Sequence, residues 1–315
     1  MFPCELYQRE WRRCFGDTHF DAIINFTGYS PFYSYFFAYG VKNSPNIKKI
    51  IWQHNIMKRD QKREANGKYP LKNSLNAVFS TYNMYDRIVS VSEQCMNENK
   101  KDFSAEKDTR YFLVHNCVAS FKEMQEKMSL KNLTFEPKVS SHKVTYLNVA
   151  RLSYAKNQLN LIEAFKNFHL IHKDTVLYIM GDGELKDEIE AQIKDCDFIY
   201  LIPYSKDPFT NMNYADFNIL PSIYEGQGLS ILEAKVLGCS TIVTNFGRDK
   251  GVTDSADILI ASPSKEDIFK ALEESAKDNY FKATNTNNFD EEEYNRQAIK
   301  EFETLFEDGY HIRNI

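Results

Sequence analysis

The segment FNILPSIYEGQGLSILEAKVLG, residues 217–238, joins a short apolar run to a helical segment through a turn that contains two glycines. The run FNILPS (217–222) has the length and composition of a buried strand. The stretch LSILEAKVLG (229–238) has the apolar spacing of a helix, and Gly238 lies where a helix C-terminus favours glycine. A strand followed by a helix is the repeating unit of α/β domains.

The same alternation extends over most of the chain after Lys143. The other apolar runs are VTYLNVARL (144–152), TVLYIMG (175–181), FIYLIP (198–203), TIVTNF (241–246) and ILIASP (258–263). Several are apolar at consecutive positions, which is typical of parallel strands that are covered on both faces. Segments with helical spacing separate them at 157–172 and 185–195. We therefore predict a doubly wound α/β domain over residues 143–288.

The first part of the chain is less regular but similar in kind. Strands are expected at 20–26, 47–54, 87–93 and 110–116, with a helix at 74–85. We predict a smaller α/β domain over residues 1–118 and a linker over the polar stretch 119–142. A last helix within 289–315, capped by Asn288 or Asp290, could cross back to the first domain.

Composition narrows the class of protein. A chain of 315 residues suggests two domains, and its net charge of −5 argues against general nucleic-acid binding. No apolar run approaches the roughly 18 residues of a membrane-spanning helix, and the N-terminus lacks the features of a secretory signal. The six cysteines are scattered without a CxxC pair, which indicates reduced thiols in the cytoplasm and disfavours a zinc site.

Two cations follow the expected strand at 144–152. In doubly wound sheets, ligands bind beyond the carboxyl ends of the strands. Arg151 and Lys156 lie five residues apart on such a loop and could reach one anionic group, with arginine able to bind phosphate oxygens bidentately. Taken alone, a pair of solvated loop charges is the simpler interpretation.

Two glutamates, Glu225 and Glu233, flank the turn after the expected strand at 217–222. Gly226 and Gly228 would let the backbone approach a ligand, and the amides at the start of the helix favour a phosphate. Each carboxylate could accept hydrogen bonds from sugar or ribose hydroxyls. A capping box formed by Ser230 and Glu233 is the structural alternative, and it accounts for Glu233 but not for Glu225.

Two further features lie at expected strand ends. Gly181, Asp182 and Gly183 form a Gly-Asp-Gly turn, but Lys186 stands where a dinucleotide fingerprint has its third glycine. A tight turn with Asp182 as a helix cap is the plainer interpretation, and a contribution to a nucleotide pocket is the other. His54 ends a first-half strand, where it could be catalytic or structural.

In this order along the chain, these motifs resemble glycosyltransferase family 4, within the glycosyl transferases group 1 of GT-B fold. The resemblance covers residues 144–250 through Arg151 to Lys156, the Gly-Asp-Gly turn at 181–183, and the segment from Pro221 to Ala234 with its paired glutamates. The first half is similar more loosely, through His54, VSVSE (89–93) and HNCV (115–118). The resemblance implies two Rossmann-like domains facing a cleft. His54 lies early, so the N-terminal domain is expected to be small or shortened.

The resemblance also implies a reaction. Members transfer a sugar, with retention, from a nucleoside diphosphate sugar such as a UDP-sugar to an acceptor, without metal or other cofactor. By this likeness Arg151 and Lys156 would neutralise the leaving diphosphate, Glu225 would hold the sugar, and His54 would contact it from across the cleft. The remaining donor-binding positions would be Gly226, Gln227, Gly228, Leu229, Glu233, Gly181, Asp182 and Gly183. The expected acceptor is a glycan or a lipid-linked glycan of cell-surface polysaccharide synthesis.

Two features of the predicted first domain bear on the partners of the protein. Residues 42–72 hold nine Lys or Arg, which could contact anionic lipid at the inner face of the cytoplasmic membrane or form a solvated face. The aromatic stretch at 28–40 could serve a lipid-linked acceptor, although a buried helix is the plainer interpretation.

A non-catalytic nucleotide-sugar-binding or partner subunit is the alternative function from another class of protein. A dehydrogenase is disfavoured because no GxGxxG motif follows a strand.

Overall fold

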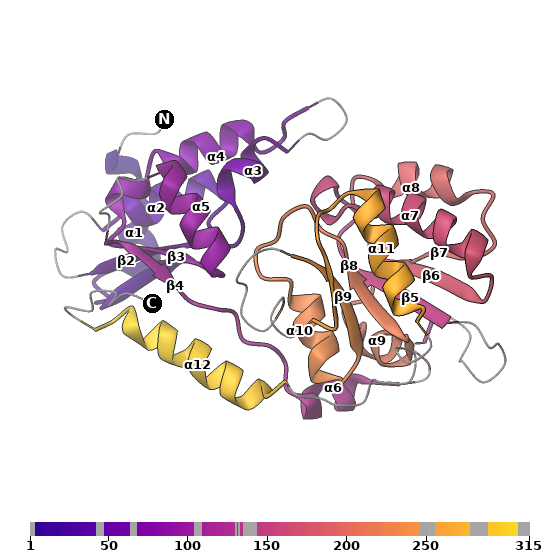
Figure 1. Ribbon diagram of the computed structural model, residues 1–315. Helices are drawn as coiled ribbons and strands as arrows, with labels where there is room; N and C mark the ends of the chain where they lie inside the picture. Colours follow the sequence, from indigo (N-terminus) through magenta and orange to yellow (C-terminus); the bar gives the residue numbers. More distant parts are fainter. Residues whose placement is uncertain are drawn as a thin grey trace. The chain divides into compact units, whose positions relative to one another are not determined.

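The computed structural model of the chain is shown in Figure 1, and it describes residues 4–41, 47–63, 68–103, 109–129, 131, 133–134, 144–245, 252, 256–277 and 289–307. The chain folds into two compact units. The first comprises Met1–Asn116 together with Gln297–Ile315, and the second comprises Cys117–Arg296. Each unit is described by itself.

The second unit is built on a six-stranded sheet in which every pairing is parallel. Its strands are β5 (Val144–Val149), β6 (Thr175–Met180), β7 (Ile199–Ile202), β8 (Phe217–Leu220), β9 (Ser240–Thr244) and β10 (Ile258–Ile260). They lie side by side in the order β10-β9-β8-β5-β6-β7. The order reverses direction between β5 and β8, so this pair is the topological switch point of a doubly wound sheet.

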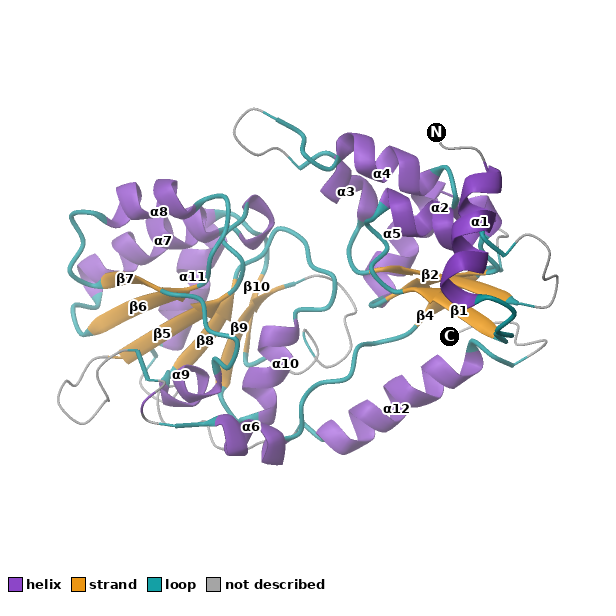
Figure 2. Cartoon of the chain, turned by 180° about the vertical axis from the view of Figure 1, so that it is seen from behind, coloured by secondary structure: helices purple, strands orange, loops and turns teal. Residues whose placement is uncertain are grey.

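Helices cover both faces of this sheet, as Figure 2 shows. One face carries α7 (Gln158–Ile171), α8 (Lys186–Ile193) and α11 (Lys265–Ser275), whose apolar side chains pack on the strands around Phe165, Phe168 and Leu177. The other face carries α9 (Phe209–Tyr214), α10 (Leu229–Val236) and α6 (Phe121–Lys127), packed around Leu147, Leu220 and Val243. Burial on both faces explains why the strands are apolar at consecutive positions.

The first unit has a four-stranded sheet in the order β1-β2-β3-β4, again parallel throughout. The strands are β1 (Ala22–Asn25), β2 (Lys48–Gln53), β3 (Arg87–Ser90) and β4 (Tyr111–Leu113). Its helices are α1 (Cys4–Phe15), α2 (Pro31–Tyr39), α3 (Met57–Gln61), α4 (Lys72–Phe79) and α5 (Glu93–Phe103). The prediction of α/β architecture with parallel sheets is therefore confirmed.

Local sequence signals account for several helix starts. Helix α2 begins at Pro31 after Ser30, whose side chain accepts a hydrogen bond from Tyr33 N. This helix lies in the aromatic stretch 28–40 and buries Tyr35 and Phe36, as the buried-helix interpretation predicts, while Phe32 is exposed. The helix expected at 74–85 ends at Phe79 and is followed by a short 3-10 turn, Tyr82–Met84.

The last helix, α12 (Glu291–Thr304), contributes to both units, since the boundary between them falls between Arg296 and Gln297. Asp290 Oδ1 accepts a hydrogen bond from Glu293 N at 2.9 Å and caps the helix, whereas Asn288 lies outside the described residues. Part of the expected linker at 119–142 is helix α6, which belongs to the second unit and buries Met124 in its core. None of the helices in the described ranges is long and apolar enough to span a membrane.

Candidate functional site

The candidate site lies at the switch point of the six-stranded sheet. β5 and β8 are neighbours there, and the chain continues from β5 toward one side of the sheet and from β8 toward the other. The loop after β5 contains Arg151 and Lys156, and the loop after β8 contains Glu225 and the glycines. Because both strands end at the same edge, the two loops meet, which is where open α/β sheets bind ligands.

The two loops are joined by hydrogen bonds. Ile223 N donates to Ala155 O at 2.8 Å, and Asn157 Nδ2 donates to Pro221 O at 2.9 Å. Asn157 has a left-handed backbone with φ of 61°, a conformation that asparagine tolerates better than most residues. These bonds fix the short turn Tyr154–Lys156, so the lysine leaves a held backbone.

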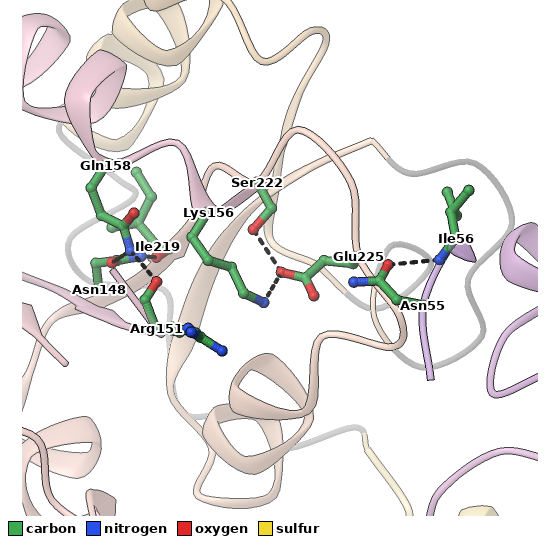
Figure 3. Close-up of polar contacts among 9 residues, drawn as sticks. All are labelled: Asn55, Ile56, Asn148, Arg151, Lys156, Gln158, Ile219, Ser222 and Glu225. Atoms are coloured by element: carbon green, nitrogen blue, oxygen red, sulfur yellow. Dashed lines mark hydrogen bonds and ion pairs between the residues drawn. The ribbon is translucent and has the colours of Figure 1, made fainter. Parts of the chain in front are cut away.

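Lys156 and Glu225 form an ion pair across the switch point (Figure 3). Lys156 Nζ lies 2.5 Å from Glu225 Oε1, and Ser222 Oγ donates to the same carboxylate oxygen at 2.6 Å. The glutamate side chain is 6% exposed, whereas the lysine side chain is 24% exposed. The lysine side chain is thus partly open to solvent at the edge of the sheet, while the glutamate side chain is enclosed.

Arg151 comes from the same loop but has a different partner. Its Nε lies 3.2 Å from Glu184 Oε2, and its side chain is 60% exposed. The residue lines a hollow of about 460 Å³ beside β6, together with Asp182, Gly183 and Tyr204. Both predicted cations thus lie in the loop after β5. Lys156 is paired with Glu225 at the switch point, and Arg151 is paired with Glu184 beside the hollow.

The glycine turn leads directly into helix α10. Gly228 is the residue before the first turn and has a left-handed φ of 63°, which favours glycine. Since the N-cap is Gly228 and not Ser230, the capping-box alternative for Ser230 and Glu233 is wrong. Gln227 is buried and its Nε2 donates to Tyr294 Oη, whereas Leu229 is 40% exposed.

Glu233 lies in the second turn of α10 and is half-buried. Burial raises the pKa of its carboxyl from 4.5 to about 7, although the charge of Lys127 acts in the opposite direction. The carboxyl is therefore poised to change its protonation state near neutral pH. With the capping role excluded, its function as a ligand group stays a prediction.

The Gly-Asp-Gly turn has a steric role. A Cβ on Gly181 would lie 2.0 Å from Ala150 O, and one on Gly183 would lie 2.3 Å from Leu152 O. Both glycines let the turn after β6 lie against the loop that carries Arg151, where Leu152 N donates to Asp182 O at 2.9 Å. The expectation that Asp182 caps helix α8 is wrong, because the N-cap is Leu185.

His54 belongs to the first unit, directly after β2. Its Nε2 lies 2.5 Å from Phe26 O, which identifies Nε2 as the protonated nitrogen and leaves the Nδ1 lone pair as an acceptor. Burial lowers the pKa of His54, so the ring is neutral at pH 7. The predicted contact between His54 and a donor sugar stays a prediction.

The sequence comparisons bear on the same segment. The family model described as glycosyl transferases group 1 matches residues 131–296, more than half of the chain. The chain belongs to the glycosyl transferases group 1 family.

Two curated relatives illustrate the likeness. The poly(glycerol-phosphate) alpha-glucosyltransferase of Bacillus subtilis is 28% identical over 228 residues, which cover 70% of this chain and 31% of that protein. The N-acetylgalactosamine-N,N'-diacetylbacillosaminyl-diphospho-undecaprenol 4-alpha-N-acetylgalactosaminyltransferase of Campylobacter jejuni is 26% identical over 167 residues, which cover 49% of this chain and 45% of that protein. The chain thus spans less than half the length of these two relatives.

Among solved structures, a mutant of S. aureus TarM in complex with Fondaparinux, alpha-GlcNAc-glycerol and UDP is similar with a TM-score of 0.69. The match has 17% sequence identity and covers 97% of this chain and 59% of that chain. This likeness shows the fold, and it confirms the prediction of GT-B architecture for this member of glycosyl transferases group 1.

Three site residues of this group 1 chain were given no role from the sequence. Ser222 lies within the predicted segment from Pro221 to Ala234 and Asn157 directly follows Lys156, so their polar side chains in these two loops were an available signal. Tyr294 had no such signal in the sequence, because it is 67 residues from Gln227 and lies in a helix with no motif.

The basic stretch 42–72 is described only in part, since residues 42–46 and 64–67 lie outside the described residues. Within it, Lys58 Nζ lies over the rings of Phe79 and Phe103, at 5.0 and 5.2 Å from their centroids.

Proposed function

We propose that the chain is a retaining, family 4 hexosyltransferase that moves a sugar from a nucleoside diphosphate sugar, such as a UDP-sugar, to a glycan or lipid-linked acceptor. The observation that carries the proposal is the Lys156–Glu225 pair at the switch point, beside the N-terminus of α10. A lysine ammonium, an adjoining arginine and the amides at the start of a helix suit a diphosphate. Membership in glycosyl transferases group 1 supports the same reaction class.

Each group has a part in the proposed reaction. The Lys156 ammonium and the amides from Gly226 to Leu229 stabilise the charge that grows on the leaving diphosphate, and Arg151 adds positive charge from the loop that also carries Lys156. Glu225, once its oxygen is released from the lysine, accepts hydrogen bonds from the sugar hydroxyls. Glu233 does the same for the ribose.

Retention fits a front-face course, in which the leaving phosphate oxygen takes the proton of the attacking acceptor hydroxyl. No side chain then needs to become covalently attached to the sugar. The neutral ring of His54 contacts the donor sugar in this proposal. Because side-chain cations and amides supply the positive charge at the diphosphate, the proposal includes neither a metal nor another cofactor.

The acceptor and the place of action come from the relatives. One has poly(glycerol-phosphate) in its name and the other diphospho-undecaprenol, so a phosphate-linked, cell-surface glycan is the proposed acceptor class. We place the enzyme in the cytoplasm at the inner face of the membrane. Exposed cations of the basic stretch, namely Lys62, Lys68 and Lys72, would contact anionic lipid there.

The proposal is tested with Lys156→Ala and the matched control Lys235→Ala. Lys235 also forms a partly buried ion pair in the second unit, with Nζ 3.1 Å from Asp257 Oδ2, but it lies in the last turn of α10. Loss of a charge-assisted hydrogen bond to phosphate should weaken binding of UDP by roughly tenfold to a hundredfold in Lys156→Ala alone. Isothermal titration calorimetry measures this, with circular dichroism to verify that both variants are folded.

Two outcomes would change the conclusion. Equal UDP affinity in Lys156→Ala and wild type would remove the phosphate assignment. Binding of UDP-sugars without any UDP release, by hydrolysis or transfer, would favour the non-catalytic nucleotide-sugar-binding subunit instead.

A further inference from the structure

The loop that is proposed to hold the diphosphate has a side-chain anchor. Gln227 lies between Gly226 and Gly228 and is only 3% exposed. Its Nε2 donates a hydrogen bond to Tyr294 Oη, in a residue that is 7% exposed. The middle residue of the loop is thus bonded to a helix 67 residues away in the sequence.

Tyr294 stands on a fixed support. It lies in the first turn of α12, where its backbone N–H donates to Asp290 O at 3.0 Å. Its ring packs against Phe289 with centroids 5.3 Å apart. The next residue, Asn295, bonds both the N–H and the carbonyl of Val118 at 2.9 Å. Packing of the ring and hydrogen bonds of the adjacent backbone and of Asn295 therefore hold Tyr294 in place.

The loop needs such an anchor because glycine flanks Gln227 on both sides. Glycines have the greatest backbone freedom, and Gly228 adopts a left-handed conformation with Val252 Cγ1 3.3 Å from its Cβ position. Amides that stabilise a developing charge act best when they are already oriented before the ligand arrives. A buried side chain between two glycines is the element that can provide this orientation.

We infer that Tyr294 is a positioning residue of the donor site, which holds the Gly226–Gly228 loop through Gln227 so that its amides meet the diphosphate. The inference rests on the proposed function. It adds a residue from outside the glycosyltransferase motifs, on the helix that continues into the first unit.

The test compares Tyr294→Phe with Tyr146→Phe. Tyr146 is also a buried tyrosine of the second unit, and its Oη lies 2.6 Å from Ser275 Oγ, between a strand and α11 and away from the glycine loop. Both changes remove one buried hydroxyl and keep the ring. The midpoint temperature of thermal unfolding should fall by a similar amount in both variants. The Kd for UDP, measured by calorimetry, should rise roughly three- to tenfold in Tyr294→Phe alone.

A double-mutant cycle separates positioning from general loss of stability. If Tyr294 acts through Gln227, then Gln227→Ala combined with Tyr294→Phe should bind UDP no more weakly than Gln227→Ala alone. Unchanged UDP affinity in Tyr294→Phe, or additive losses in the double variant, would overturn the inference. Absence of UDP binding by the wild-type chain would instead show that the proposed function fails, and the inference would fail with it.

Discussion

At the scale of single residues, Glu233 shows how position within a helix sets the charge of a carboxyl. Glu233 is half-buried in the second turn of α10, and this burial raises the pKa of its carboxyl to about 7. A carboxyl with a raised folded-state pKa stabilises the fold fully below its unfolded value, and this contribution is lost as the pH rises through the folded value. Glu233 therefore makes the second unit less stable at pH 8 than at pH 5.

This sign gives a direct prediction for Glu233→Gln. The wild-type midpoint of thermal unfolding, followed by circular dichroism, should fall between pH 5 and pH 8, and the fall should be smaller in the variant. Glu163→Gln, which alters a side chain that is 49% exposed, is the control and should follow the wild type. A Glu233→Gln variant with the pH profile of the wild type would contradict the raised pKa.

The residues of the site differ in how far the sequence revealed them. Lys156, Glu225 and Gly228 were predicted because each stands at a fixed offset from a strand end. The ion pair between the first two was not predicted, since it depends on β5 and β8 being neighbours. Strand order is a tertiary property that spacing along the chain does not encode. The same holds for the contact of Tyr294 with Gln227.

At the scale of elements, the turn after β6 decides how closely two loops of the site approach. Gly181 lies against the backbone of Ala150, and a Cβ at this position would stand 2.0 Å from a carbonyl oxygen. Backbone cannot move aside as a side chain can. The glycine thus fixes the spacing between the loop with Arg151 and the turn with Asp182.

Gly181→Ala should therefore destabilise the second unit by about 2–4 kcal/mol, as expected for a substitution that forces backbone apart. Gly16→Ala is a useful comparison, because Gly16 has a left-handed φ of 57° but nothing within 4 Å of its Cβ position. Its cost should be limited to about 1–2 kcal/mol of backbone strain. Denaturant unfolding followed by circular dichroism measures both, and equal costs would indicate that the close approach at Gly181 relaxes freely.

Strands were predicted more completely than helices, for a physical reason. A parallel strand that is buried on both faces has an apolar sequence, as in β8 and β9, where every residue is buried. Helix α9 has six residues and α6 buries only Met124, so neither shows the repeat of a longer amphipathic helix. Helix α6 consequently fell within the expected linker.

At the scale of the whole molecule, the first unit is completed by residues from the end of the chain. Leu305 is fully buried in a cluster with Ile50, Trp52 and Val89, and Phe302 lies 6.2 Å from Trp52 between ring centroids. Length suggested two domains, and the last helix was expected as one that could cross back. The core that it completes could not be predicted, because the partners are more than 200 residues away.

Two polar contacts add to this closure of the first unit. Glu301 Oε2 accepts hydrogen bonds from His115 N at 2.9 Å and from His115 Nδ1 at 2.8 Å, and Lys48 Nζ donates to Phe306 O at 2.9 Å. They hold the second half of α12 and the turn after it to the ends of β2 and β4. The stability of the N-terminal unit should therefore depend on C-terminal residues.

Leu305→Ala tests this dependence, because removing a fully buried leucine side chain costs about 2–5 kcal/mol. Both tryptophans of the chain, Trp11 and Trp52, belong to the first unit, so intrinsic tryptophan fluorescence reports the unfolding of that unit. UDP affinity reports the second unit. The variant should lose thermal stability by fluorescence and keep the wild-type Kd for UDP, whereas Leu170→Ala, at a leucine that is 67% exposed, should change neither. A fluorescence transition that stays at the wild-type temperature in Leu305→Ala would mean that burial of Leu305 does not stabilise the first unit.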